Sequence, residues 1–122
     1  PLYPGTGSPR EHGSFGNIVN APLAPMSGSA EFRAAMAETV LPAMRAFKPD
    51  IVLISAGFDA HRADPLAMLN LENADYGWAT AELMAVADEF CGGRVVSTLE
   101  GGYDLNALAA SAAAHVRALM TA

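Results

Sequence analysis

Short apolar runs alternate with longer amphipathic stretches along this chain. Residues 51–55 are almost continuously apolar, and residues 94–99 contain Val95, Val96 and Leu99, which predicts two buried β-strands. A shorter run over residues 18–21, closed by prolines, is a third strand candidate. Strands that are apolar on successive residues are usually covered on both faces, so the pattern favours a parallel sheet.

A first helix is predicted between the first two strands, from Ser29 to Phe47. Its apolar residues recur every three to four positions, which is the spacing of one helix face. Ser29 is expected to be the N-cap, and the charge of Glu31 favours the first turn. Because Pro42 lies inside the pattern, we expect a kink or a split at that point.

Two further helices are predicted on either side of the last strand. The first covers residues 76–90, with Asn73 or Asp75 as its cap, and the Gly-Gly pair that follows is typical of a helix end. The second begins after Asp104, which is expected to be its cap. The expected buried stripe of this last helix consists of Leu105, Leu108, Ala112, Val116 and Leu119.

The resulting element order is β-α-β-α-β-α. This alternation predicts the α/β class, with a three-layer parallel sheet, helices on both of its faces and right-handed crossovers. Three strands are few for such a sheet, and both of its edges are left bare. We therefore expect the edges to pair with further strands of the same sheet or with another chain.

Composition limits the functional classes. The chain has 122 residues, of which 52% are hydrophobic, and a formal net charge of −6. The acidic balance and the scattered basic residues argue against direct nucleic-acid binding. No apolar run approaches the ~20 residues of a membrane span, so we expect no membrane partner. The single cysteine, Cys91, cannot form an internal disulfide, and we expect a cytoplasmic location.

Polar side chains follow the two long apolar runs, at the points where the strands should end. The motif from Ser55 to Leu66 contains Asp59-Ala60-His61, and the second motif is Glu100-Gly-Gly-Tyr-Asp104. Open α/β sheets bind ligands beyond the carboxyl ends of their strands. The sequence therefore predicts a metal or catalytic site where the two motifs converge.

The residue types alone leave several roles open. Asp59 is either a metal ligand or a loop carboxylate that turns the chain, whereas Asp64 is expected to brace the loop by hydrogen bonds. His61 is expected at the surface or behind a ligand, because alternation along an extended chain would point it away from Asp59. His115, in the last helix, is expected to be structural.

These motifs resemble those of the zinc-dependent histone deacetylase superfamily. The resemblance rests on Ser55–Leu66 and on Leu99-Glu-Gly-Gly-Tyr-Asp-Leu105, with further similarity at residues 2–7 and 16–20. It points to the class II branch and to the bacterial deacetylase-like and acetylpolyamine-amidohydrolase-like proteins. Residues 1–122 would form the carboxyl-terminal portion of a single catalytic domain with the arginase/deacetylase fold.

The resemblance implies roles for two polar side chains. Asp59 would be one of the zinc ligands, through a carboxylate oxygen. Tyr103 would be catalytic, because its hydroxyl would stabilise the charge that develops on the carbonyl oxygen of the substrate. The position of His61 is not a ligand in the family.

The resemblance also implies four substrate-binding positions. Gly101 and Gly102 would let the backbone approach the substrate, because neither residue carries a Cβ atom. Leu66 and Tyr3 would line the substrate channel. An acidic residue is found at the position of Leu66 in a polyamine-selective branch, so Leu66 favours acyl-lysine or another neutral amide.

The implied function is hydrolysis of an acetyl-amide bond with Zn²⁺ as cofactor. The other zinc ligands and the histidine dyad of the family belong to a preceding portion, so we expect the isolated chain to be inactive. It would need that portion, or contacts with a second copy, to cover its sheet edges. The alternative is a catalytically incompetent, deacetylase-derived interaction module. A reading frame with the missing motifs directly upstream would favour the enzyme.

Overall fold

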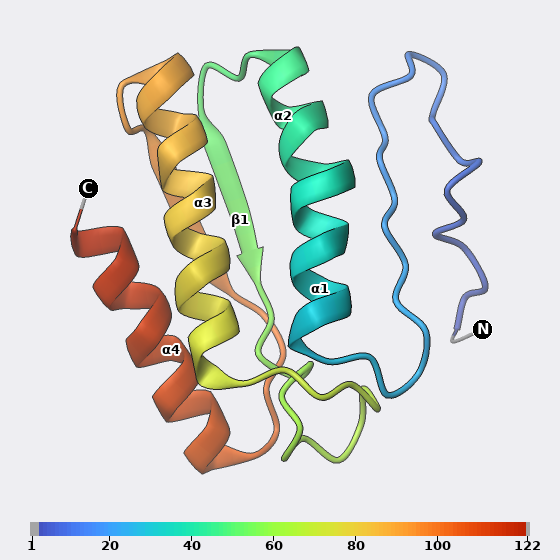
Figure 1. Cartoon of the computed structure of the whole chain (residues 1–122), viewed down its shortest axis with the longest axis vertical. Helices are drawn as coiled ribbons and strands as arrows, with labels where there is room; N and C mark the ends of the chain where they lie inside the picture. Colours follow the sequence, from blue (N-terminus) through green and yellow to red (C-terminus); the bar gives the residue numbers. More distant parts are fainter. Residues whose placement is uncertain (1–2, 122) are drawn as a thin grey trace.

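The computed structural model describes residues 3–121 and shows a parallel two-stranded sheet packed against helices (Figure 1). In chain order the elements are α1 (Ser29–Ala35), the π-helix η1 (Met36–Val40), α2 (Leu41–Phe47), β1 (Val52–Ala56), α3 (Asn73–Cys91), β2 (Val95–Leu99) and α4 (Leu105–Met120). Both long apolar runs are strands, within one residue of the predicted bounds. None of the described helices is long and apolar enough to cross a membrane.

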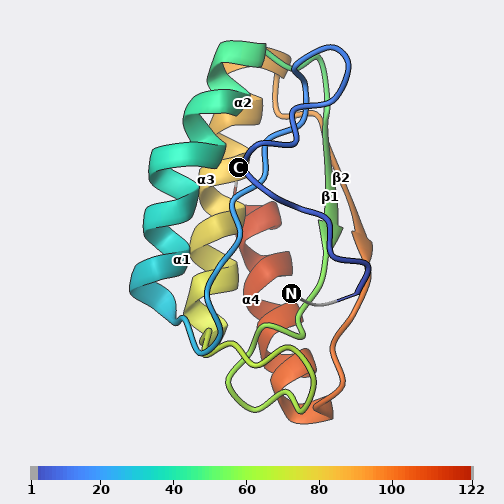
Figure 2. The same cartoon turned by 90° about the vertical axis from the view of Figure 1, so that its right-hand side faces the viewer.

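The two strands run in parallel, with Val52 opposite Val95 and Ala56 opposite Leu99. This confirms the parallel α/β class. Within residues 3–121 all the helices lie on one face of the sheet, as Figure 2 shows, so this stretch does not supply a second helical layer. The open face carries Leu53, which is 72% exposed, and Val96, which is 55% exposed.

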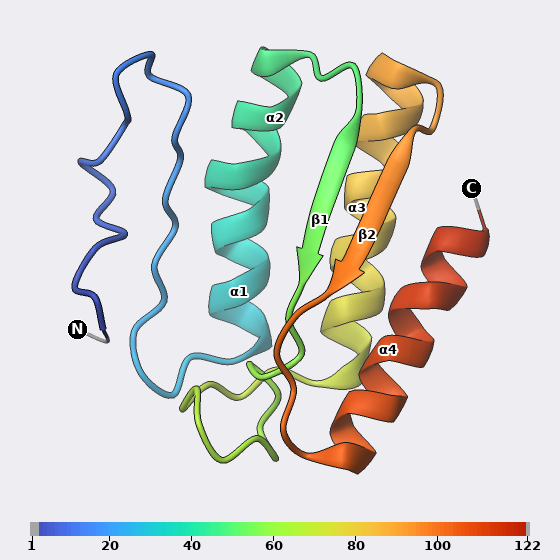
Figure 3. The same ribbon diagram turned by 180° about the vertical axis from the view of Figure 1, so that it is seen from behind.

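The third predicted strand, at residues 18–21, is wrong. These residues are extended but pair with no strand in the described part of the chain. They belong to an irregular segment that runs along the outer side of α1 and α2, away from β2 (Figure 3). An apolar extended run becomes a strand only where a neighbouring backbone completes the ladder, and here a hollow separates it from the free edge of β1.

The first helix begins one residue earlier than its predicted cap implied. Gly28 is the N-cap, and its N–H donates to Glu31 Oε2 at 2.9 Å. Ser29 is instead the first helical residue, and its hydroxyl donates to Asp75 on α3. The predicted interruption at Pro42 takes the form of the wider π-turn that directly precedes α2, because proline cannot donate to the usual partner four residues back.

The other helix ends follow the sequence more closely. Gly92 ends α3 in the left-handed conformation, with φ 59°, and Asp104 caps α4 by accepting from Ala107 N at 2.8 Å. The N-cap of α3 is Glu72, a residue before the expected candidates. Asp75 is the third helical residue, and its carboxylate stabilises this helix end by accepting from Glu72 N at 2.9 Å.

The buried face of α4 differs from the predicted stripe. Its buried residues are Ala107, Ser111 and His115, whereas Leu105 is 79% and Val116 49% exposed. Small side chains face α3 because the two helices approach closely there, so that a Cβ atom on Gly77 would lie 3.6 Å from that of Ala114. Leu108 and Ala112 of the predicted stripe are partly buried and pack against the core, whereas Leu105 and Val116 lie on the exposed sides of the helix.

Candidate active site

Backbone hydrogen bonds join the two polar motifs beyond the ends of the strands. Glu100 N donates to Ala56 O at 2.9 Å, and Phe58 N donates to Gly101 O at 2.8 Å. These bonds extend the ladder between β1 and β2 by several residues. The residues that follow β1 and those that follow β2 therefore meet at one corner of the molecule, as the sequence predicts.

Asp59 lies directly against the second motif. A Cβ atom on Gly101 would come within 2.7 Å of Asp59 Oδ2, and one on Gly57 within 3.1 Å of Oδ1. The residue is half-buried, and the structure shows no hydrogen bond to its carboxylate from residues 3–121. A carboxylate held in a tight backbone cradle, with its oxygens free, has the geometry of a ligand for a cation.

Tyr103 follows a glycine that no other residue could replace without strain. Gly102 has φ 143°, and a Cβ atom on it would approach Leu108 Cδ1 to 2.8 Å. The Tyr103 side chain is 57% exposed, so packing within the described chain covers less than half of it. Its side chain is therefore largely accessible, and its backbone belongs to the corner where Asp59 lies.

Asp64 braces the two loops, which confirms the role expected from the sequence. Its Oδ2 atom accepts from Tyr103 N, and its Oδ1 atom accepts from Leu66 N, both at 2.9 Å. Leu66 itself is 60% exposed. One carboxylate thus links the backbone of the candidate channel residue to that of the candidate catalytic tyrosine.

His61 is buried rather than at the surface, with 7% of its area exposed. Its Nδ1 atom accepts from Ala63 N at 3.1 Å, and its backbone forms an isolated bridge with Leu71. Of the two positions that the sequence left open, the surface one is wrong, because the loop folds back on itself at this point and covers the ring. The imidazole serves to shape the loop that carries Asp59.

Packed aromatic rings support the corner where the two motifs meet. Phe58 lies between Tyr76 and His115, with ring centroids 5.1 and 5.7 Å away. His115 is hydrogen-bonded through both nitrogens, to Thr80 Oγ1 at 2.7 Å and Ser97 Oγ at 2.8 Å, which confirms a structural role. Burial lowers the pKa of His115, because the charged imidazolium loses its hydration.

Tyr76 is a polar residue of this corner that the sequence predicts only as part of a buried helix face. Its hydroxyl is buried without a hydrogen-bond partner among residues 3–121. Burial, followed by the carboxylates of Asp59, Asp64 and Asp75, raises the pKa of this hydroxyl well above its usual range. The sequence showed only that an aromatic residue lies at an apolar position of α3. It did not indicate that carboxylates would lie near its hydroxyl.

Tyr3 does not join this corner. It is 99% exposed and belongs to the irregular segment outside α1 and α2 (Figure 3). The described chain therefore brings together Asp59, Leu66, Gly101, Gly102 and Tyr103, but not the remaining candidate channel residue.

The described residues supply only part of a metal site. Among residues 3–121 there is no group of three or more His, Cys, Asp or Glu side chains that could hold a metal ion. A catalytic zinc typically takes three protein ligands and keeps one open position. Asp59 fits as one of the three, and the others are not found in this stretch.

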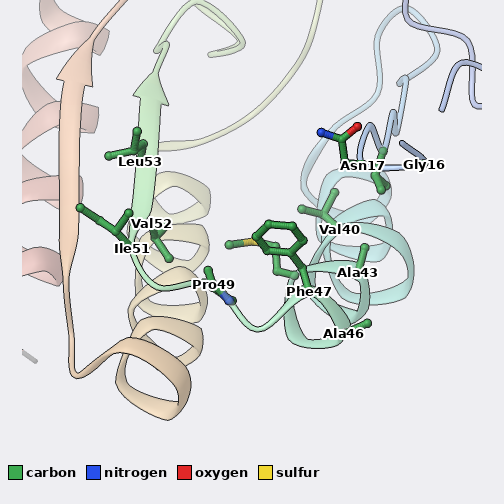
Figure 4. Close-up of a pocket in the computed structure, with 12 residues that line it drawn as sticks. Gly16, Asn17, Val40, Ala43, Ala46, Phe47, Pro49, Ile51, Val52 and Leu53 are labelled. Carbon is green, nitrogen blue, oxygen red and sulfur yellow. The ribbon is translucent and has the colours of Figure 1, made fainter. Parts of the chain in front are cut away.

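A large hollow lies away from the corner. It measures ≈ 700 Å³ and lies between the irregular segment, α2 and the amino-terminal part of β1 (Figure 4). Phe47, Ile51 and Leu53 are among its apolar lining residues. It contains no candidate catalytic residue, so we place the active site at the carboxyl ends of the strands.

The chain is similar to known deacetylases along nearly its whole length. The histone deacetylase domain matches residues 1–119. Histone deacetylase 10, chloroplastic, from Oryza sativa is 45% identical over 97% of this chain, and histone deacetylase 14, chloroplastic, from Arabidopsis thaliana is 44% identical over 97%. A probable deacetylase of Archaeoglobus fulgidus is 41% identical over 86% of the chain.

Solved structures agree with these relatives. The crystal structure of the HDA15 HD domain superposes with a TM-score of 0.89 at 41% identity, over 98% of this chain and 34% of that one. The two plant relatives are also much longer, since the chain spans only 27% and 29% of their lengths. The fold thus agrees with the comparisons, and the chain belongs to the histone deacetylase family.

Proposed function

We propose that this chain is part of a zinc-dependent enzyme that hydrolyses acetyl-amide bonds. The family supports deacetylase chemistry in general. The observation that carries the proposal is the corner where the unpartnered carboxylate of Asp59 lies against Gly101, two residues from Tyr103. In this arrangement a candidate cation ligand and a candidate hydrogen-bond donor come from adjoining loops, which would suit metal-assisted hydrolysis of an amide.

Asp59 is proposed to hold the zinc ion together with ligands from outside this stretch. When bound, zinc supplies an activated water and polarises the carbonyl of the substrate. The chain's own part is to hold the carboxylate still, and the contacts with Gly57 and Gly101 restrict its rotation. These close contacts leave little room for any residue larger than glycine at position 101.

Tyr103 is proposed to donate its hydroxyl to the carbonyl oxygen of the substrate as negative charge develops there. Loss of one such donor typically costs about 10²–10³ in kcat. Gly101 and Gly102 are proposed to let the backbone beside this phenol approach the substrate, and the exposed Leu66 is proposed to line the apolar channel. Tyr3 is proposed to join the channel wall when further chain is packed against residues 3–28.

The 122 residues are proposed to be inactive in isolation. They offer one zinc ligand and, among the described residues, no cluster that completes a metal site. A domain of which this chain is the carboxyl-terminal portion would supply the remaining ligands and the general base. The same additional chain, or a second copy, would cover the exposed face of the sheet around Leu53 and Val96.

The test uses the longest gene product that contains these residues, here called the full gene product. We expect it to bind zinc and to deacetylate an acetyl-lysine peptide. Asp59→Asn should lower its zinc content at least tenfold, whereas Tyr103→Phe should keep the zinc and lose about 10²–10³ in kcat. Asp50→Asn, at the other end of β1, is the matched control and should change neither quantity.

Undiminished turnover in both Asp59→Asn and Tyr103→Phe would remove the site assignment. Preference for an acetylated polyamine over the acetyl-lysine peptide would overturn the role given to Leu66. These two outcomes are independent, because the first concerns the reaction and the second only the channel.

A second candidate function rests on the uncovered sheet face. Leu53 and Val96 lie opposite each other on adjacent strands, and both are more than half exposed. In an interaction module this face would bind another protein instead of completing a catalytic domain. A full gene product that binds no zinc and turns over no acetyl-amide, yet forms a stable complex through this face, would favour this function.

The compartment stays a prediction. Cys91 is a free, buried thiol, which is compatible with a reducing cytoplasm. Two plant relatives are named as chloroplastic, so the family is not confined to one location. Fractionation of the source cells followed by immunodetection of the chain tests the cytoplasmic assignment.

A further inference from the structure

We propose that Asp64 is the positioning residue that sets the place of Tyr103 at the active site. The inference rests on the proposed function, because it assigns a role to Asp64 in that same reaction. Asp64 touches neither Asp59 nor the phenol in any hydrogen bond of the structure. It acts on the backbone that carries the tyrosine.

The carboxylate of Asp64 connects two loops that are far apart in sequence. Oδ2 accepts from Tyr103 N at 2.9 Å, across 39 positions of the chain, and Oδ1 accepts from Leu66 N at 2.9 Å. Both oxygens are thus engaged by backbone N–H groups. Hydrogen bonds to an ionised acceptor are about twice as strong as those between neutral groups.

Tyr103 needs such a restraint because its neighbours provide little of their own. Gly101 and Gly102 precede it, and glycine leaves the backbone free to adopt many conformations. The side chain of Tyr103 is 57% exposed, so packing restrains it weakly. On the other side the chain is fixed by Asp104, which caps α4 through Ala107 N. The Asp64 bond fixes the side of Tyr103 that faces the glycines.

The loop that carries Asp64 is a firm base for this restraint. Leu71 N donates to Ala60 O, and Arg62 N donates to Leu71 O, both at 3.0 Å. Asp64 N donates to His61 O at 2.9 Å, and the His61 ring is buried. Asp64 therefore joins Tyr103 to a loop whose own backbone is hydrogen-bonded.

Keeping both of these hydrogen bonds requires two acceptor oxygens at position 64. The amide of an asparagine offers one oxygen and one NH₂ group, and the NH₂ group cannot accept from a backbone N–H. Asp64→Asn therefore breaks one of the two bonds at nearly unchanged volume, and Asp64→Ala breaks both. A graded loss is expected across the two variants.

The first test measures turnover of an acetyl-lysine peptide by the full gene product. We expect Asp64→Asn to lower kcat about 10-fold and Asp64→Ala about 100-fold, with KM and zinc content changed less than about threefold. In a Tyr103→Phe background, Asp64→Asn should lower kcat by less than about threefold, because the hydroxyl that it positions is already gone. Asp50→Asn is the matched charge control and should match the unsubstituted protein.

The second test follows hydrogen exchange at the Tyr103 amide and needs no turnover. Asp64→Ala should raise its exchange rate at least tenfold, while amides of α3 keep theirs. An unchanged Tyr103 amide would overturn the positioning role, as would an equal loss of kcat with and without the tyrosine hydroxyl. Failure of the proposed function looks different, because the unsubstituted full gene product would then lack turnover while the Tyr103 amide still responded to Asp64→Ala.

Discussion

Two irregular stretches of this chain, residues 57–72 and residues 3–23, both carry a candidate channel residue. The stretch 57–72 is bonded to several other parts of the molecule, for example by Met26 N to Met68 O at 2.7 Å and by Asn70 N to Ser27 O at 2.8 Å. In residues 3–23 the described hydrogen bonds stay within the segment, such as Ile18 N to His12 O at 3.1 Å. One stretch is thus built into the fold, and the other rests beside it.

The difference shows what positions a functional loop. Backbone N–H and C=O groups must find partners wherever they are buried. Residues 57–72 find theirs on β2's following loop, on residues 26–28 and within the loop itself, which fixes the place of Asp59. Residues 3–23 are mostly exposed, and Phe15 is 91% exposed. We propose that their apolar side chains are covered only when more of the domain is present.

The largest expected difference is between a glycine-to-alanine substitution that lies against residues 57–72 and one that lies within residues 3–23. Gly101→Ala puts a Cβ atom within 2.7 Å of Asp59 Oδ2, so the carboxylate must move. We expect deacetylase activity of the full gene product to fall at least 100-fold and its stability by about 1–3 kcal/mol. Gly16→Ala meets no atom within 4 Å and should change activity less than threefold, despite its φ of +63°. Equal effects would break the comparison.

A medium effect is expected at Asp75, which holds the chain at the point where residues 57–72 end. Asp75 is fully buried and accepts from Arg33 Nε at 2.8 Å and from Glu72 N at 2.9 Å. Asp75→Asn should lower the free energy of unfolding by about 1–3 kcal/mol in urea titrations. Glu11→Gln replaces the charged acceptor of Gly7 N in the other stretch by a neutral amide oxygen, and should cost less than about 0.5 kcal/mol.

Asp75 also makes the free energy of unfolding depend on pH, and the direction of its pKa shift fixes the sign of this dependence. Burial alone raises the pKa of Asp75, but hydrogen bonds from Glu72 and Ser29 and the Arg33 charge outweigh it and hold this pKa below the usual 3.8. The stabilisation is therefore present above pH 3.8 and is lost as the pH falls through the lowered value. Asp75→Asn should flatten the acid limb of the stability curve. An unchanged limb would show that Asp75 contributes nothing.

The smallest expected effect concerns His115, which supports residues 57–72 through Phe58. Burial lowers the pKa of His115 below 6.5, so the unfolded chain binds its proton first. The contribution of the neutral imidazole is present above pH 6.5 and is lost as the pH falls. His115→Gln should reduce the change in urea midpoint between pH 7.5 and 5.5. His12→Gln, exposed in the other stretch, should leave that change as it was, and the opposite ranking would contradict the assignment.

Local pattern was enough to predict the elements that position the site. The apolar runs marked β1 and β2 within one residue, and Asp104 was recognisable as a cap because its short carboxylate can accept from the turn that follows it. The two motifs after the strands were visible as polar residues where a parallel sheet ends. Their meeting could be expected because parallel neighbouring strands end at the same edge.

Other features depended on contacts that a linear pattern does not contain. Residues 18–21 have the composition of a strand, yet no strand among residues 3–121 pairs with them. The stripe predicted for α4 followed the larger apolar residues, whereas the close approach of α3 selects Ala107 and Ser111. For His61 the sequence left open a place at the surface or behind a ligand, because the folding back of its loop cannot be read from its spacing from Asp59.

Amino-acid order alone therefore established the class of fold and the positions of the two paired strands, and it named the candidate residues for the chemistry. Those properties follow from short-range rules of side-chain burial, capping and turn formation. Packing in three dimensions settled which carboxylate is free and which is engaged, since Asp59 and Asp64 look alike in the chain. Only the approach of a distant backbone, with the N–H of Tyr103 reaching Asp64 and Gly101 lying against Asp59, distinguishes a brace from a candidate ligand.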